Sequence, residues 1–376
     1  MNTPSTPNPI LDLESAFAAR HGAPAAVATG LGRAALYLAL EAAGVRGQQV
    51  LVPDFICAQV LQAVRAAGAT PVFYAVPLDL TIQSDALVPA LAYQPRAAIL
   101  VHYFGAPQPH VAQLVQLCRE WGVVAIEDCA LALLAAGADG LCGTHGDFAT
   151  FSFTKNNWCY GGGMVMAQDR AAVARLNELR ETLLVSDDDF CHAYGQLCQL
   201  DFEANRPTLS RASAAAGQRL QEELSSADAR FRNANFFDAA PCDLRMSAPA
   251  AQRAIEILRS EQQQAVRRAA AYSRLLRSAG APVVEPGKWL ALNGDCRTLL
   301  SAAHNASYLV VCFTKGSVGA HIERAAEKGI TLRPVWPDFQ REVAQTIHRG
   351  RLATMEIHPD LTESEINTVV GFLLEG

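Results

Sequence analysis

The first half of the chain alternates between short apolar runs and longer alanine-rich segments of helical length. This pattern predicts strands at 49–52, 70–74, 97–102, 123–127, 147–153 and 163–167, and helices at 33–43, 58–67 and 110–121. Strands separated by helices of this length indicate βαβ units and a mostly parallel sheet. Run 97–102, AAILVH, is apolar almost throughout, which is typical of a strand covered on both faces.

The second half has a different pattern. Residues 186–240 combine an acidic cluster, a small-residue stretch and a polar segment, which predicts helices broken by loops. Further on, the sequence predicts a long Arg/Gln/Ala-rich helix at 248–278, a strand at 307–313, a helix at 317–328, a strand at 331–336 and a final helix that opens with a Thr362–Glu365 capping box. We therefore expect a large α/β domain over 1–240, with a variable helical segment at about 186–240, and a smaller α/β domain over 241–376.

Composition excludes several classes of protein. Of 376 residues, 50% are hydrophobic and 18% charged, which suits a large buried core and excludes a disordered chain. A net charge of -6 without clustered Lys/Arg argues against nucleic-acid binding. Without a signal-peptide pattern or an apolar run of roughly 18 residues, we expect a cytoplasmic protein with no membrane partner. Ten cysteines, Cys129 and Cys312 among them, lie scattered without a C-x-x-C pair, which predicts buried free thiols rather than disulfides; we expect no metal site.

The first candidate for chemistry is Asp128, at the end of the strand that closes with IEDCA (126–130). In a parallel sheet, ligands bind beyond the carboxyl ends of the strands. A carboxylate there can hold a cationic heteroatom of a ligand. Taken alone, the residue is better explained as the N-cap of a following helix, which is the usual role of an aspartate after a strand.

The second candidate is Lys155, which follows the strand GDFATFSF (146–153) and precedes the glycines at 161–163. Only four of the 31 basic residues are lysines, so this one is conspicuous. A partly desolvated lysine loses its proton more readily and can form a Schiff base with an aldehyde. Ser152 and Thr154 are hydroxyls placed to bind a phosphate, and the glycines allow close backbone approach. The alternative is a solvated turn lysine.

The third candidate is the start of a helix at Thr29-Gly30-Leu31-Gly32-Arg33-Ala34. The amides and the positive dipole end of a helix N-terminus form an anion site. Arg33 adds a full charge and a bidentate donor for a phosphate. The alternative is an ordinary helix start with a surface arginine. Together, a phosphate site, a carboxylate for a ring nitrogen and a lysine for an aldehyde match pyridoxal 5'-phosphate.

In this order the segments resemble the DegT-type aminotransferase family of fold-type-I pyridoxal-phosphate enzymes, which mostly aminate nucleotide-linked keto-sugars. GRAAL (32–36) resembles the family's G-T-A-A-L phosphate turn, 51–73 its V-P-S-F-T-F…A-G-A-x-P-V-F segment, and VHYFG (101–105) its H-x-Y-G loop. IEDCA resembles I-E-D-A-A, and GDFATFSF…K…GGG matches the lysine segment. LRMS (244–247) and HPDLTESE (358–365) match later signatures. The resemblance implies a seven-stranded, mostly parallel sheet and a homodimer with active sites at its interface.

The resemblance also implies roles for individual residues. Asp128 would pair with the pyridinium nitrogen, Ala130 would pack under the ring, Ser152 would bind the phosphate and Lys155 would be the Schiff-base lysine. The phosphate turn would consist of Gly32, Arg33 and Ala34. The family's sugar dehydratases have histidine at the lysine position, so Lys155 favours transamination.

Four positions depart from the family pattern. Leu131 replaces a glutamine, and Cys57 replaces the ring-stacking aromatic residue in the cofactor site. Arg33 replaces a threonine, and Asp243 replaces an asparagine that reaches the phosphate from the partner subunit. We expect Arg33 to bind the phosphate and Asp243 of the partner subunit to hold the guanidinium. The alternative for Asp243 is a surface turn residue.

The resemblance implies amino transfer from an amino acid, which we expect to be L-glutamate, to a ketone, which we expect to be a nucleotide-linked keto-sugar. The departures leave open a pyridoxal-phosphate enzyme with a non-sugar substrate, and a non-catalytic homologue that kept the fold. The candidates for diphosphate binding are Arg206, Arg211, Arg230, Arg232 and Arg333, each equally explained as a surface arginine. Trp158 and Tyr160 could form a pocket wall or belong to the core.

Overall fold

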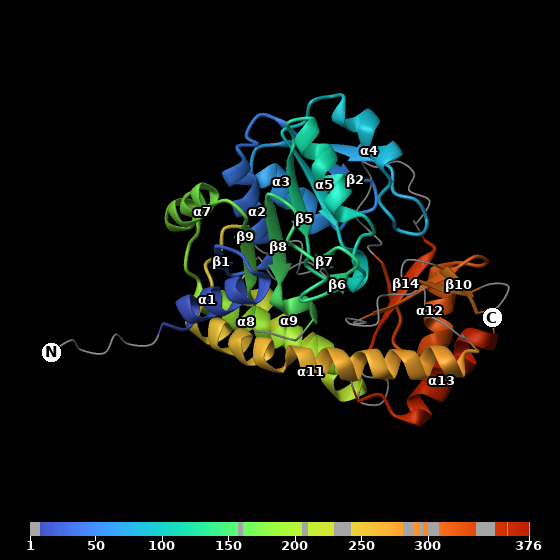
Figure 1. Cartoon of the computed structure of the whole chain (residues 1–376). Helices are drawn as coiled ribbons and strands as arrows, with labels where there is room; N and C mark the ends of the chain where they lie inside the picture. The colour runs from blue at the N-terminus through green and yellow to red at the C-terminus, as the bar shows by residue number, and fades with distance from the viewer. Residues whose placement is uncertain are drawn as a thin grey trace.

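The computed structural model describes residues 8–156, 161–204, 210–228, 242–280, 289–292, 296–299, 308–335, 350–358 and 360–375. The N-terminal part is built on a seven-stranded sheet in the order β1-β9-β8-β5-β4-β2-β3 (Figure 1). Its strands are β1 (Ala25–Thr29), β2 (Gln49–Pro53), β3 (Thr70–Tyr74), β4 (Ala97–Val101), β5 (Val124–Asp128), β8 (Phe148–Ser152) and β9 (Gly163–Ala167). Neighbours pair in parallel except β9, which is antiparallel to β1 and β8. The predicted mostly parallel sheet is confirmed.

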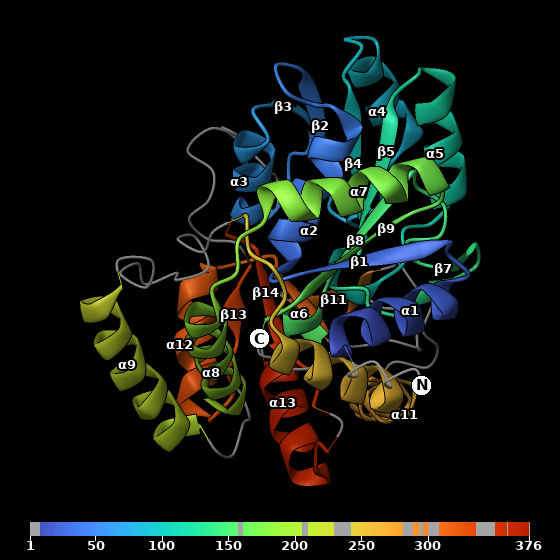
Figure 2. The same cartoon turned by 90° about the vertical axis from the view of Figure 1, so that its left-hand side faces the viewer.

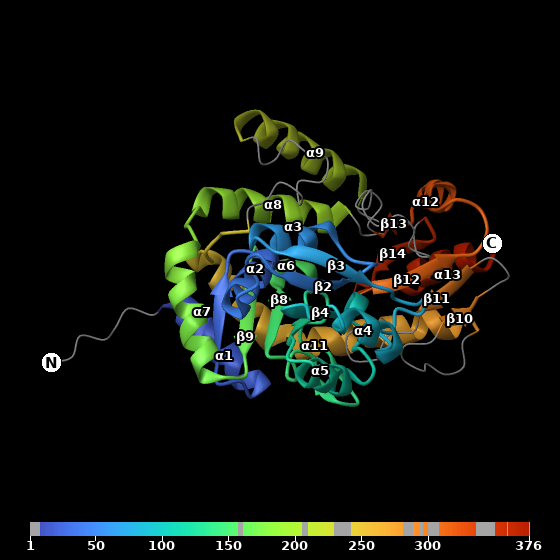
Figure 3. The same ribbon diagram turned by 90° about the horizontal axis from the view of Figure 1, so that it is seen from above.

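Helices cover both faces of this sheet (Figure 3). They are α1 (Pro9–His21), α2 (Gly32–Ala43), α3 (Ala58–Ala66), α4 (Ser84–Leu91), α5 (Val111–Glu120) and α7 (Arg170–Leu183). Every residue of β4, β8 and β9 is buried, as expected for strands covered on both sides. The predicted strands and helices agree with these bounds to within one or two residues, whereas α1, β1, α4 and α7 were not predicted.

A single long helix, α11 (Ala248–Ser278), connects this sheet to the C-terminal part. Its 31 residues extend about 46 Å at 1.5 Å per residue. Ser247 caps the start, where its hydroxyl accepts a hydrogen bond from the Ala250 amide at 3.3 Å. Buried residues of the first half, such as Ile257, pack with α1 against the large sheet, and those of the second half, such as Leu275, pack into the C-terminal core. The bounds predicted for this helix are confirmed.

The C-terminal part is built on a five-stranded antiparallel sheet in the order β10-β11-β12-β14-β13. Its elements are β10 (Trp289–Ala291), β11 (Cys296–Leu299), β12 (Tyr308–Phe313), β13 (Arg333–Pro334) and β14 (Leu352–Glu356), with helices α12 (Val318–Glu327) and α13 (Glu363–Glu375). The predicted capping box begins α13: the Thr362 amide donates to Glu365 Oε2 at 2.8 Å, and the Glu365 amide donates to Thr362 Oγ1 at 3.2 Å. The strands β10, β11 and β14 were not predicted.

The variable segment forms a pair of helices, α8 (Asp188–Ala204) and α9 (Ser210–Ala227). They pack on each other, and α9 lies away from the large sheet (Figures 2 and 3). The domain boundary predicted at residue 240 falls within 229–241, outside the described residues. No helix in the described part of the chain has the length and apolar character needed to cross a membrane. The eight described cysteines are free, and Cys129 and Cys312 are buried as predicted.

Candidate active site

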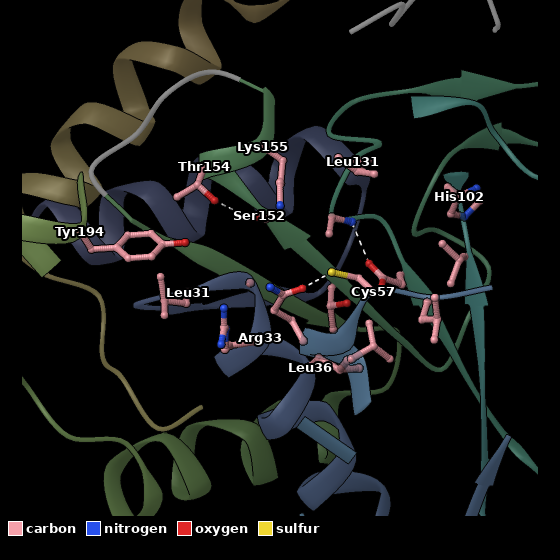
Figure 4. Close-up of a pocket in the computed structure, with 18 residues that line it drawn as sticks. Leu31, Arg33, Leu36, Cys57, His102, Leu131, Ser152, Thr154, Lys155 and Tyr194 are labelled. Carbon is pink, nitrogen blue, oxygen red and sulfur yellow. Dashed lines mark hydrogen bonds between the residues drawn. The ribbon is translucent and has the colours of Figure 1, made fainter. Parts of the chain in front are cut away.

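A cavity opens where the parallel strands β4, β5 and β8 end, as Figure 4 shows. Strand ends bring polar groups to it from segments far apart in the sequence: His102 follows β4, Asp128 ends β5 and Ser152 ends β8. Its lining consists of Leu31, Gly32, Arg33, Leu36, Ile56, Cys57, Gln59, Val60, Val101, His102, Asp128, Ala130, Leu131, Thr150, Ser152, Thr154, Lys155 and Tyr194. The placement agrees with the rule that ligands bind outside the carboxyl ends of parallel strands.

Lys155 lies in the short helix α6 (Phe153–Asn156), directly after β8. Its side chain points into the cavity (Figure 4), so the solvated turn lysine considered from the sequence is wrong. The backbone of this residue is held from the C-terminal sheet: the Tyr308 hydroxyl on β12 donates to the Lys155 carbonyl oxygen at 2.8 Å. The lysine segment is therefore fixed by both parts of the chain.

Asp128 is 7% exposed and carries its carboxylate on the floor of the cavity. Oδ1 accepts a hydrogen bond from the Ala130 amide at 2.9 Å, which forms a tight turn. Turns rather than a helix follow this residue, so it is not the helix N-cap that the sequence alone favoured. Burial raises the pKa of Asp128, although the Ala130 hydrogen bond and the nearby charge of Lys155 lower it. A cationic partner inside the cavity would stabilise the ionised carboxylate.

A buried hydrogen-bond network lies behind this floor. Glu127 accepts from the amides of Gly143, His145 and Gly146 at 2.6–2.8 Å, and from His102 Nε2 at 2.9 Å. Burial alone would raise the pKa of Glu127, but these donors lower it to about 2. The Gln108 amide donates to His102 Nδ1 at 2.9 Å, so the proton that Glu127 accepts is the one on Nε2. Because its two nitrogens already have partners, His102 is not a free acid or base.

Three residues of this region, His102, Glu127 and Cys129, are of the types that bind metal ions. Ligand atoms of His102, Glu127 and Cys129 lie within 4.8 Å of one another. The carboxylate already accepts four hydrogen bonds, and the lone pair of His102 Nδ1 faces the Gln108 amide. A cation would have to displace these bonds, so the arrangement is that of a structural network.

The opposite end of the cavity is formed by the start of α2 and the end of β8. Gly32 begins α2, which has neither a side-chain cap nor an acidic residue in its first turn. A Cβ atom at Gly32 would lie 2.8 Å from Ser152 Cβ, so only glycine allows this close approach. Ser152 Oγ and Thr154 Oγ1 lie 2.8 Å apart. Two hydroxyls and a helix N-terminus thus meet here, which suits an anion.

Arg33 extends this anion site: the residue is 8% exposed and lines the cavity. Its Nη1 donates to Gln62 Oε1 at 2.9 Å, which holds the side chain in place. Cys57 lies on the same wall, where its thiol is hydrogen-bonded to Gln59. Burial raises the pKa of Cys57, while the positive charges of Lys155 and Arg33 lower it, so both cations lie near this thiol.

Most of the predicted site residues meet at this cavity: Gly32, Arg33, Cys57, Asp128, Ala130, Ser152 and Lys155. Two do not line it within the chain. Ala34 is buried in α2 and its amide donates to the Leu31 carbonyl at 3.0 Å. Asp243 accepts at its carbonyl from the Val185 amide at 2.7 Å, outside the cavity lining. Their predicted roles stay predictions.

Other candidates fall outside what the structure describes, or were missed. Trp158, Tyr160, Arg206, Arg230, Arg232 and the side chain of Arg211 lie outside the described part, and Arg333 is half-buried on β13. Tyr194 also lines the cavity but was not predicted from the sequence, because nothing in the sequence of the segment 186–240 links this residue to the sheet. His102 carried a weak signal, since it ends a predicted strand.

The large mostly parallel sheet, the smaller C-terminal sheet and the cavity at the strand ends are features of one class of protein fold. Solved aminotransferases share the whole architecture, which confirms a fold-type-I arrangement. The aminotransferase TlmJ from Streptoalloteichus hindustanus superposes with a TM-score of 0.70 at 21% identity, covering 98% of this chain and 90% of that one. DesI, crystallised in the presence of its TDP-sugar product, superposes with a TM-score of 0.67 at 19% identity, covering 99% of this chain and 85% of that one.

Within that class, the chain belongs to the DegT/DnrJ/EryC1/StrS aminotransferase family, whose sequence profile matches residues 5–234. A dTDP-4-dehydro-2,3,6-trideoxy-D-glucose 4-aminotransferase from Saccharopolyspora spinosa is 34% identical over 152 residues, 39% of each chain. GDP-perosamine synthase from Escherichia coli O157:H7 is 31% identical over 172 residues, 45% of this chain and 47% of that one. A pleiotropic regulatory protein from Geobacillus stearothermophilus is 33% identical over 177 residues, 46% and 47%. The chain thus spans less than half the length of these relatives.

Proposed function

We propose that this protein is a pyridoxal 5'-phosphate-dependent aminotransferase that aminates a nucleotide-linked keto-sugar. The observation that carries the proposal is the single cavity into which Lys155, Asp128 and the anion site at Ser152 and Arg33 all project. An amine, a carboxylate and an anion site at separate positions of one cavity suit an aldehyde, a ring nitrogen and a phosphate on one ligand. Family membership supports the same assignment.

The residues present fit this cofactor. Close approach of Gly32 to Ser152 leaves the amides of α2 and two hydroxyls at one end of the cavity, where an anion is favoured. Asp128, buried with a raised pKa, gains from a protonated ring nitrogen, which would stabilise its ionised form. When bound, the cofactor supplies an electron sink that lets the α-proton of an amino acid leave.

Each residue then has a separate task. Arg33, Ser152 and Thr154 bind the phosphate and fix its position. Asp128 keeps a proton on the ring nitrogen. Lys155 would hold the cofactor through its aldehyde, and its Nζ would carry a proton as general acid and base. His102, whose ring is held by Glu127 and the Gln108 amide, forms part of the cavity wall and does not transfer a proton.

The substrate assignment rests on relatives. Two matched relatives are named for sugar nucleotide chemistry, as dTDP-4-dehydro-2,3,6-trideoxy-D-glucose 4-aminotransferase and GDP-perosamine synthase. One structural neighbour, the putative sugar aminotransferase Spr1654 from Streptococcus pneumoniae, is described in its PMP form. We extend the proposal to L-glutamate as amino donor, to a homodimer with the active site at its interface, and to a cytoplasmic location.

The test begins with cofactor attachment. Borohydride reduction of the protein loaded with pyridoxal phosphate, followed by peptide mapping, should place the label on Lys155. A label on Lys288, Lys315 or Lys328 would contradict the assignment, and the absence of any label would favour a non-catalytic homologue. Product analysis should then compare keto-sugar nucleotides with a panel of other ketones, since Leu131 makes the wall near Lys155 more apolar than the family's glutamine would. Turnover confined to the other ketones would overturn the substrate assignment.

A further inference from the structure

Three chain segments meet beside the anion site: Gly30, the residues at Val185 that lead into α8, and residues 243–245. The Gly30 amide donates to the Leu244 carbonyl at 2.7 Å, directly before α2. Val185 and the 243–245 segment exchange two backbone hydrogen bonds, at 2.7 and 2.8 Å. A Cβ atom at Gly30 would lie 2.6 Å from the Arg245 carbonyl oxygen, so these segments are in close contact. The entry to α8 therefore has a defined position relative to the start of α2.

Helix α8 begins directly after this segment, at Asp188, and its first turn is capped. Asp187 Oδ1 accepts from the Phe190 amide at 2.9 Å, which caps the helix, and Asp188 and Asp189 occupy the first turn. The acidic cluster of the sequence is thus explained as a helix start. Tyr194 lies about two turns after Asp187, so it is on the same side of the helix as the cap.

Tyr194 is 3% exposed and belongs to a small core with Leu31, Ala34, Phe190 and Leu244. Its ring stacks on that of Phe190, with 5.9 Å between the centroids and 25° between the planes. Since Leu31 and Ala34 belong to the same core, the ring lies near the first turn of α2. The hydroxyl points into the cavity, toward the end that holds Arg33, Ser152 and Thr154 (Figure 4).

We infer that the Tyr194 hydroxyl is a direct ligand of the cofactor's phosphate, supplied by α8 of the same chain. The inference rests on the proposed function. A phenol hydroxyl donates a hydrogen bond to a phosphate oxygen, and it adds to a site that already has a guanidinium and two hydroxyls. The variable segment thereby has a role in the active site: α8 forms the wall that closes its phosphate end.

The test compares two aldehydes that differ only in the phosphate. Dissociation constants of pyridoxal 5'-phosphate and of pyridoxal are measured by absorbance titration of the cofactor-free protein, for the wild type and for Tyr194→Phe. The ring packing survives in phenylalanine, so only the hydroxyl is lost. A hydrogen bond to a charged group predicts that affinity for the phosphate ester falls about tenfold. Affinity for pyridoxal should change less than about twofold, because pyridoxal has no phosphate to accept that bond. Inorganic phosphate should also compete less well in the variant.

Tyr37→Phe is the matched control, because Tyr37 lies on α2 but does not line the cavity. It should leave both constants unchanged. An equal loss of affinity for both aldehydes in Tyr194→Phe, or no loss for either, would overturn the inference and leave the proposed function standing. A wild-type protein that binds neither aldehyde would instead overturn the proposed function, and the role of Tyr194 with it.

Discussion

The two sheets of this protein contribute to the cavity in very different ways. In the large sheet, β2, β4, β5 and β8 run in one direction, so their carboxyl ends meet at one edge and deliver His102, Asp128 and Ser152 to a common site. In the small sheet every pairing is antiparallel, so neighbouring strands end at opposite edges. The small sheet reaches the lysine segment through Tyr308, which bonds to a backbone carbonyl.

The large sheet therefore supplies side chains to the cavity, and the small sheet supports the backbone beside it. Side chains at the strand ends of the large sheet line the cavity, whereas the small sheet holds the segment that carries Lys155. Substitutions in the two regions should therefore differ both in size and in the quantity that they change.

The largest effect is expected for Lys155→Ala, which removes the amine that we propose holds the aldehyde and moves the proton. Amino transfer should fall by about ten-thousandfold. Steady-state turnover with an amino donor and a keto acceptor measures this. Lys315→Ala removes an exposed lysine of the C-terminal part and serves as control. Comparable losses in the two variants would abolish the distinction between the regions.

Glu127→Gln tests the network behind the site through stability. A pKa lowered from 4.5 to about 2 corresponds to about 3 kcal/mol in favour of the folded state. This contribution is complete above pH 4.5 and is lost as pH falls toward 2, because the carboxylate is protonated earlier in the unfolded chain. Urea unfolding should show the variant destabilised at pH 7 and the difference shrinking below pH 4.5.

The counterpart in the small sheet is Thr298→Val, which removes a buried hydroxyl that donates to the Val310 carbonyl at 2.9 Å. Its cost should be about 1 kcal/mol, and it should not vary with pH. A pH-independent loss in Glu127→Gln would mean that the charge of the carboxylate does not matter.

Asp128→Asn separates the two roles of this residue. Asparagine keeps an oxygen for the Ala130 amide, so the turn survives, but the negative charge that we propose holds the ring-nitrogen proton is lost. Turnover should drop about a hundredfold while the unfolding midpoint stays within experimental error. Turnover close to that of the wild type would show that Asp128 serves only the turn.

Tyr308→Phe should have the smallest effect. The hydroxyl bond to the Lys155 carbonyl is lost, but the edge contact of the ring with Phe104, at 6.5 Å between centroids, can persist. We expect kcat to fall about fivefold, the size of one net hydrogen bond, with KM for the amino donor unchanged. A raised KM with unchanged kcat would show that the small sheet acts on substrate binding instead.

Elements with a strong local pattern were predicted well. The long helix α11 begins and ends where its composition changes, and the strands that carry Asp128 and Ser152 lie within a residue of their predicted bounds. The strands β10 and β11 were not predicted, because three and four residues give too little periodicity to separate a strand from a loop. Strand β14 is as long as the predicted strands of the large sheet and was missed as well.

By itself, the sequence determined the parallel sheet and the residues that follow its strands, since hydrophobic periodicity and turn chemistry act over a few residues. It also determined the motifs that mark Lys155 and the start of α2. Only the tertiary structure decided that Ala34 and Asp243 lie off the cavity and that Tyr194 lines it. Tyr194 and Leu31 are 163 positions apart in the numbering of the chain and pack in one core. Contacts across such separations depend on how whole helices and sheets pack, which no local pattern records.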